Sequence, residues 1–218
     1  MKKCVCAALL VCALLCGCGG NIKNDRRYMV SALGFESENG RLNVFAEIII
    51  INSENPDTEP EAKVFKGSGN TTEEALDEIS DLLTKPILLD HCGVLVIGRS
   101  ITPHALSEIC DYSFKENRIT LSAYMVSSEN AGELLSCEPQ SSAAVGYDIM
   151  GLIEQTRQRT KKNCPCRYFE VEARRESGKN RFVLPSLRAE NGGIKICGYF
   201  RFENDAAVGF DKTAEPRQ

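Results

Sequence analysis

The chain has 218 residues, with 26 Lys and Arg against 30 Asp and Glu and a formal net charge of −4. Charges of both signs are spread along it, whereas nucleic-acid binding requires a clustered basic face, so this composition argues against a nucleic-acid partner. It argues equally against electrostatic docking on an anionic membrane. A chain of this length is expected to form one large domain, or one domain plus part of another.

The first 17 residues have the pattern of an export signal. Lys2 and Lys3 precede an uncharged apolar stretch over residues 5–16. This stretch is shorter than the roughly 20 residues that a membrane-spanning helix needs, but it suits the core of a signal peptide. We therefore predict a signal peptide over residues 1–17.

The end of this stretch indicates how the chain is held after export. Residues 15–18 read Leu-Cys-Gly-Cys, which resembles the lipobox of bacterial lipoproteins, whose cysteine receives a diacylglyceryl group and becomes the new N-terminus. An ordinary secretory signal is the alternative, but Leu15 does not suit the small-residue cleavage site that such signals carry. We predict lipidation at Cys18 and a lipidated polar tether over residues 18–27. Two acyl chains would hold the protein stably, since one alone binds marginally.

Six cysteines lie outside the signal and the anchor: Cys92, Cys110, Cys137, Cys164, Cys166 and Cys197. An exported chain can form disulfides, but these six show no tight framework spacing. A metal site built on the close pair at 164 and 166 would need two further ligands, and the two histidines lie far away in sequence. We interpret the thiols as small core groups, with room for one disulfide whose pairing is left open, and expect no metal and no cofactor.

The N-terminal half is predicted to alternate strands and helices. Residues 28–35 and 42–50 read as a hairpin closed at Gly40, because their apolar residues alternate with period two. Residues 52–61 read as a polar loop. Residues 67–69, Gly-Ser-Gly, then lead into a helix that starts with a Thr71–Glu74 capping box and stops before Pro86.

A buried strand over residues 93–98 follows this helix, and we expect Ile79 and Leu82 of the helix to be buried against Val94 and Val96 of the strand. A second helix begins at residues 102–103, with Phe114 among the residues on its inner face.

The C-terminal half begins with a strand over residues 119–126, a short helix over 131–135 and a longer helix over 143–160. Four strands are predicted after that, over residues 167–173, 182–184, 194–202 and 206–210. The last two are joined by a two-residue turn at 204–205. The fold class is therefore α+β: a mixed β-sheet covered by helices, followed by a short β-rich C-terminal segment.

Candidate chemistry in the sequence is sparse. The glycine loop at residues 67–71 precedes a helix, where backbone amides favour an anion, but it lacks both the Walker pattern and the dinucleotide fingerprint. His91 has neighbours that point to opposite faces of a strand, so we interpret it as a hydrogen-bonded structural residue. His104, in the first turn of a helix, is expected to be solvated. No catalytic residues are predicted, which favours a binding or assembly protein over an enzyme.

Six blocks behind the lipobox, in the same order, resemble the Ger(x)C family of C-subunit lipoproteins of spore-germination receptors. The most recognisable is Asp-His-Cys-Gly-Val-Leu-Val-Ile-Gly at residues 90–98. The others are residues 25–34, 67–76, 111–119, 131–135, and 184–187 with 198–209. The chain departs from the family pattern at Arg99, where an acidic residue is common, and at residues 115–117, Lys-Glu-Asn.

The resemblance implies a non-enzymatic, membrane-anchored subunit of a nutrient germinant receptor that acts in spore germination by protein–protein contact. Its implied partners are the integral-membrane A- and B-type receptor subunits, and its implied place is the outer face of the spore inner membrane. The resemblance divides the chain into an N-terminal α/β domain over residues 28–187 and a truncated start of a second domain over 188–218. The family's third domain has no counterpart, so we expect the chain to fail alone as a receptor subunit.

A lipid-anchored extracytoplasmic solute-binding protein or enzyme is the alternative. A solute binder needs comparable lobes around a cleft, for which a chain of this length with a β-rich end offers poor material. An enzyme needs a catalytic constellation. The predicted C-terminal hairpin is expected to form but to be the least stable part, because its edges are open to pair with other strands.

Overall fold

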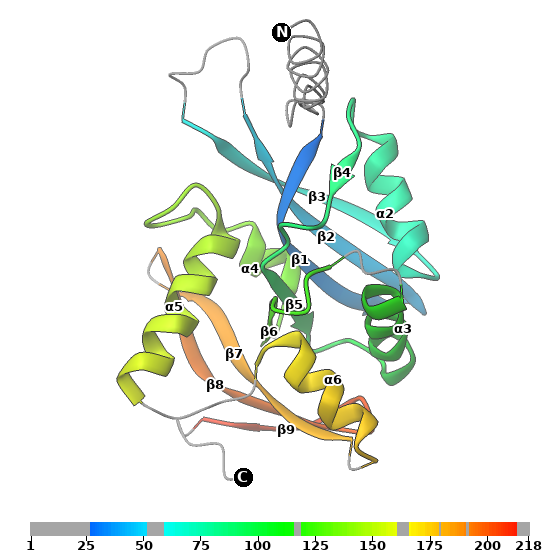
Figure 1. The fold of residues 1–218 in the computed structure, drawn as a ribbon, viewed down its shortest axis with the longest axis vertical. Helices are drawn as coiled ribbons and strands as arrows, with labels where there is room; N and C mark the ends of the chain where they lie inside the picture. Colours follow the sequence, from blue (N-terminus) through cyan, green and yellow to red (C-terminus); the bar gives the residue numbers. More distant parts are fainter. Residues whose placement is uncertain are drawn as a thin grey trace, which may run out of the picture.

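A computed structural model describes residues 27–51, 59–115, 119–160, 166–178, 180–190 and 192–212 of the chain. Its centre is a mixed nine-stranded sheet in the order β3-β2-β1-β5-β6-β7-β8-β9, with the short β4 paired to β1 (Figure 1). The strands are β1 (Tyr28–Glu38), β2 (Arg41–Ile50), β3 (Glu61–Gly69), β4 (Ile87–Leu88), β5 (Val94–Gly98), β6 (Tyr124–Ser128), β7 (Arg181–Glu190), β8 (Gly193–Glu203) and β9 (Ala206–Asp211). The helices are α2 (Thr72–Asp81), α3 (Pro103–Lys115), α4 (Ala131–Leu135), α5 (Val145–Thr160) and α6 (Tyr168–Glu176). The predicted α+β class is confirmed.

The first hairpin forms as its alternation predicts. Strand β1 pairs antiparallel with β2 through a two-residue turn in which Asn39 and Gly40 both have positive φ, the geometry that matches strand twist. Strand β3 then pairs antiparallel with β2. The sequence predicted no element over residues 62–66 and a loop over residues 67–69, whereas β3 runs through both. The strand was missed because Lys63 and Lys66 break the apolar pattern, which a strand at the edge of a sheet tolerates.

Parallel pairing builds the middle of the sheet. Strand β1 pairs in parallel with β5, β5 with β6, and β6 with β7. Strand β6 begins at Tyr124, later than predicted. Residues 168–176 form helix α6, so the strand predicted over 167–173 was wrong. There Tyr168 and Val171 are buried at helical spacing, while Phe169 between them is half-exposed.

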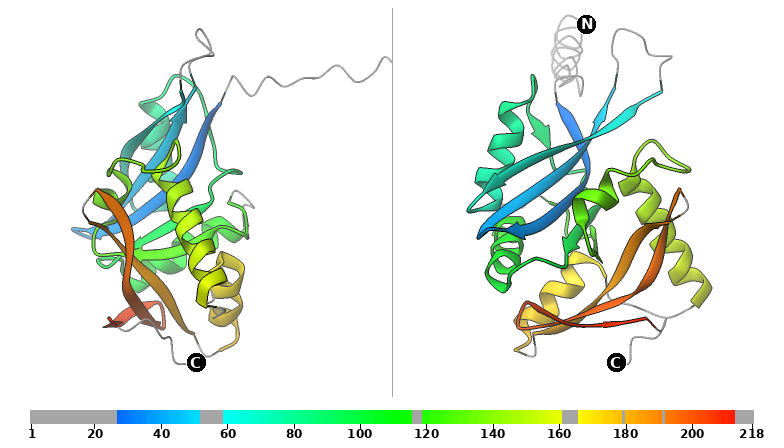
Figure 2. Two further views of the ribbon diagram at one scale, coloured as in Figure 1. Left: turned by 90° about the vertical axis from the view of Figure 1, so that its left-hand side faces the viewer. Right: turned by 180° about the vertical axis from the view of Figure 1, so that it is seen from behind.

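Two apolar cores lie on the two faces of the sheet (Figure 2). One packs α2, α3 and α6 against residues such as Leu95 and Ile97 of β5. The other packs α4 and α5 against Val94 and Val96 of the same strand, because successive side chains of a strand point to opposite faces.

The burial predicted for α2 and α3 is therefore only partly right. Ile79 is buried on the face of Leu95, opposite Val94 and Val96. Leu82 is the C-cap residue of α2 and is 63% exposed, so its predicted burial was wrong. Phe114, near the end of α3, is exposed as well.

The C-terminal strands continue the same sheet. Strand β7 spans residues on both sides of the domain boundary predicted at 187–188, and it joins β6 to the antiparallel pair β8 and β9. The predicted two-residue turn is confirmed, with positive φ at Asn204 and Asp205. Arg175 of α6 holds this turn through two bonds to the Asp205 carboxylate at 2.8 and 2.9 Å. The hairpin is thus docked on α6, and the division into two domains stays a prediction.

Candidate functional site

The glycine loop before α2 was the strongest sequence candidate for an anion site, and its amides are already engaged. Backbone amides of this segment donate to carboxylates of the protein: Ser68 to Glu78 at 2.7 Å, Asn70 to Glu74 at 2.7 Å, and Thr72 to Glu108 at 3.0 Å. The Thr71 hydroxyl accepts from the Glu74 amide and completes the predicted cap. Because these donors serve to position α2, this loop does not offer them to a ligand.

Close packing explains the two glycines of this loop. A Cβ on Gly67 would lie 2.0 Å from the carbonyl oxygen of Ala75, and one on Gly69 would lie 2.6 Å from the Cβ of Glu74. Real Cβ atoms do not approach other atoms this closely, so a side chain at either position would push α2 away from β3. The Gly-Ser-Gly pattern is therefore a helix-packing feature.

The helices on the other face of the sheet are held by carboxylates in the same way. Glu36 of β1 accepts from the amides of Ala131 and Gly132 at the start of α4, at 2.5 and 3.0 Å. A carboxylate at this end of a helix also complements its dipole. No local sequence pattern indicates this bond, because its partners are far apart along the chain.

Glu47 of β2 does the same for α5 and is almost fully buried. Its carboxylate accepts from the amides of Val145 and Gly146 at 2.6 and 2.8 Å and from the Ser31 hydroxyl at 2.6 Å. Burial raises the pKa of Glu47 above its ordinary value, and these three hydrogen bonds oppose the shift. The side chain therefore has the partners of a structural anchor, with the carboxylate turned toward the protein's own donors.

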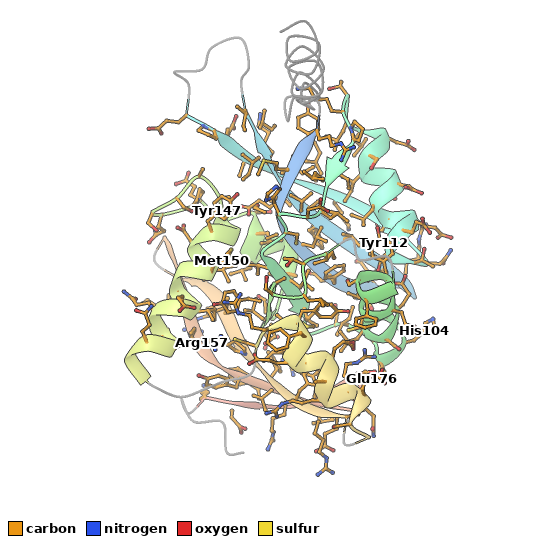
Figure 3. The ribbon with its side chains drawn as sticks, viewed as in Figure 1. His104, Tyr112, Tyr147, Met150, Arg157 and Glu176 are labelled. Atoms are coloured by element: carbon orange, nitrogen blue, oxygen red, sulfur yellow. The ribbon has the colours of Figure 1, made fainter. Side chains whose placement is uncertain are left out.

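The two histidines lie in different settings. His91 is exposed in the turn before β5, so its predicted role as a hydrogen-bonded structural residue was wrong: the strand starts only at Val94. His104 is exposed on α3, as predicted. It shares with Tyr112 of α3 and Glu73 of α2 the lining of a hollow of about 470 Å³. Figure 3 labels His104 and Tyr112 on α3. The described residues contain no group of three or more His, Cys, Asp or Glu placed to hold a metal ion.

Five of the six cysteines outside the signal and the anchor can be placed, and the structure describes no disulfide between them: Cys92, Cys110, Cys137, Cys166 and Cys197. Those at 92, 110 and 166 are buried, as expected of small core groups. Burial raises the pKa of Cys92 to about 12 and also raises that of Cys110, which makes both thiols poor nucleophiles. Cys164 lies outside the described residues, as does the predicted lipidation site, Cys18.

A groove of about 590 Å³ lies on the C-terminal strands of the sheet. Its lining mixes basic, acidic and apolar side chains, among them Arg188, Lys195, Phe210 and Lys212. Strand β9 pairs with β8 only over Tyr199–Glu203, so within the described residues the first half of β8 has no strand on its outer side. An open strand edge beside a groove can accept an extended segment. This surface is suited to binding, and the sequence predicted its open edges but not the groove.

The described helices include none that is both long and apolar enough to cross a membrane. The fold defines an α+β domain built on one continuous mixed sheet. On both faces of this sheet, backbone amides at helix N-termini donate to carboxylates of the protein itself. The chain belongs to the family described as "Spore germination protein N-terminal domain", whose sequence model matches residues 23–189. This confirms the resemblance to the Ger(x)C family.

A solved structure, "Crystal Structure of the GerBC protein", is similar to this chain at 15% sequence identity and a TM-score of 0.41. The match covers 83% of this chain and 51% of that chain, so the present chain spans about half the length of this relative. No curated protein matches the chain.

Proposed function

We propose that the chain is a lipid-anchored subunit of a nutrient germinant receptor, acting in spore germination by protein–protein contact and not as an enzyme. The observation that carries this proposal is the family match over residues 23–189, which begins just after the lipobox cysteine. The engagement of the glycine loop with α2 supports the same view, because it assigns a packing role to the best candidate for phosphate chemistry.

The anchor in this proposal is the lipid on Cys18, with residues 1–17 removed as the signal peptide. Residues 18–27 tether the lipid to a fold that starts at Tyr28. The partners are the integral-membrane A- and B-type receptor subunits on the outer face of the spore inner membrane. Residues 28–187 form the N-terminal domain and residues 188–218 the start of a second one, which β7 joins to the first in one sheet.

Fatty-acid labelling tests the anchor. The full chain is produced in a spore-forming host fed radioactive palmitate, beside two variants, Cys18→Ala and Cys16→Ala. We expect Cys18→Ala to lose the label and to leave the membrane fraction. Cys16→Ala is the matched control, because it removes a neighbouring thiol within the predicted signal peptide and should keep both label and location. Unchanged labelling of Cys18→Ala would refute lipidation at this residue.

A further inference from the structure

The tether enters the fold at one identifiable end of the molecule. Strand β1 starts there, at Tyr28, whose amide donates to the carbonyl of Pro86 at 2.9 Å and whose hydroxyl lies 3.2 Å from that of Thr84. The loop after α2 is thus held against the start of β1. The end of β2 lies on the other side, because Met29 pairs with Ile49. Figure 1 shows these segments together at the top of the molecule.

Two large aliphatic side chains are exposed at this end. Leu82, the C-cap of α2, is 63% exposed, and Ile51, just after β2, is 56% exposed. Leu83 next to Leu82 packs on the core, so the turn directs one leucine inward and the other outward. Exposed apolar side chains also occur elsewhere on the described surface, so exposure alone does not require a partner; what distinguishes these two is their place beside the start of β1, where the tether enters the fold.

The charges around these two side chains are of both signs. Lys85 lies over the Tyr28 ring, with its ammonium 5.6 Å from the ring centre, while Asp81 and Glu61 are exposed nearby. The Glu61 carboxylate is paired with Lys63 at 3.3 Å. A surface with this balance offers little net attraction to an anionic bilayer, so apolar contact has to supply the interaction.

The length of the tether limits what this end can meet. About ten residues separate Cys18 from Tyr28, and ten residues reach at most roughly 35 Å when fully extended. A folded chain of this size has a radius of gyration of about 17 Å. A lipid on Cys18 would therefore keep this end of the fold close to the headgroups, at a high local concentration of bilayer surface.

We propose that Ile51 and Leu82 insert into the bilayer surface, so that the end of the domain where β1 starts faces the membrane. This inference rests on the proposed lipid anchor and adds an orientation to it. Strand β9 lies at the opposite end of the molecule in the views of Figures 1 and 2, so this strand lies away from the lipid. Because the insertion is apolar, added salt should not release it.

Tryptophan fluorescence tests this orientation directly, since the chain contains no Trp. Leu82→Trp and Ile51→Trp each introduce a single reporter at the membrane end. Val208→Trp is the matched control, because Val208 on β9 is also half-exposed but lies at the far end. The lipidated full-length variants are reconstituted into vesicles of phosphatidylethanolamine and phosphatidylglycerol, with or without phosphatidylcholine brominated on its acyl chains.

We expect brominated lipid to quench Leu82→Trp and Ile51→Trp and leave Val208→Trp unchanged, with the emission of the first two shifted to the blue. Vesicle flotation without quenching at 82 and 51 would overturn this inference alone and leave the anchor standing. Quenching of Val208→Trp equal to that of the other two would overturn the orientation. Failure to float with the vesicles would refute the anchor, and the inference with it.

Discussion

The ion cluster between α6 and the β8–β9 turn determines how firmly the C-terminal strands are held. Arg175 donates to both oxygens of Asp205, at 2.8 and 2.9 Å, and to Glu172 at 3.0 Å. The three side chains are only 11–12% exposed. Arg175→Met keeps most of the aliphatic stem, removes the charge, and leaves two carboxylates largely buried without their common partner.

The cost follows from this burial. Removing one partner of a fully buried ion pair costs about 3–5 kcal/mol, and the slight exposure here lowers the expectation to about 3 kcal/mol. At roughly 2–4 °C per kcal/mol for a chain of this size, the melting temperature should fall by about 6–12 °C. Arg181→Met is the matched control, because the Arg181–Glu203 pair is 72% and 46% exposed and is worth at most about 1 kcal/mol.

Urea unfolding followed by circular dichroism measures both variants, and amide hydrogen exchange shows where the loss is felt. We expect exchange in Arg175→Met to rise first in β9 and in the adjoining half of β8. Adding Asp205→Asn to Arg175→Met should recover part of the lost stability, since it removes one of the two buried carboxylates left without a partner. Equal stability of Arg175→Met and Arg181→Met would show that α6 does not hold the hairpin.

Three further predictions follow from packing and burial. Gly67→Ala should unfold or severely destabilise the protein, because the added Cβ would meet the Ala75 carbonyl. Gly151→Ala, which has open space around it inside α5, should instead raise the free energy of unfolding by about 1 kcal/mol. Thermal melting distinguishes the two variants. Burial raises the pKa of Glu47, so its stabilising effect is largest in acid and is lost as the pH rises through the folded pKa. The stability of wild type relative to Glu47→Gln should therefore fall as the pH rises above the ordinary glutamate pKa of about 4.3; a difference that does not change with pH would contradict the assignment. Cys92 should resist iodoacetamide in the native protein and react on unfolding, with mass spectrometry as the readout.

The order of elements could be predicted where local patterns carry it. The hairpin of β1 and β2, the cap at Thr71 and the turn at 204–205 each depend on residues close together in sequence, and each is confirmed. Strand β3 could not be predicted so easily, because its charged edge residues hide the alternation.

Helix α6 shows how a short segment misleads. Residues 167–173 alternate as a strand would, but two features favoured a helix. The Glu170 carboxylate accepts from the amides of Cys166 and Arg167 at 3.1 and 3.0 Å and caps the N-terminus, and two arginines stand in the last turn. For a nine-residue helix, these end signals were better guides than periodicity.

The candidate surfaces depend on tertiary contacts that no local pattern encodes. The glycine loop carries the spacing of a ligand site, yet its amides face Glu78, Glu74 and Glu108, and the last of these comes from a different helix. Likewise, Leu82 fits the apolar stripe of α2 in the sequence but is the exposed C-cap residue of that helix.

Germination of spores that lack this chain is the most direct test of its role in the response to nutrients. Such spores are exposed to a panel of amino acids, sugars and nucleosides, and loss of absorbance is followed alongside spores that carry the wild-type gene or Cys18→Ala. We expect at least one nutrient response to be lost without the chain, to return with the wild-type gene, and not to return with Cys18→Ala. Unchanged responses to every nutrient in the panel would contradict a role in nutrient-triggered germination.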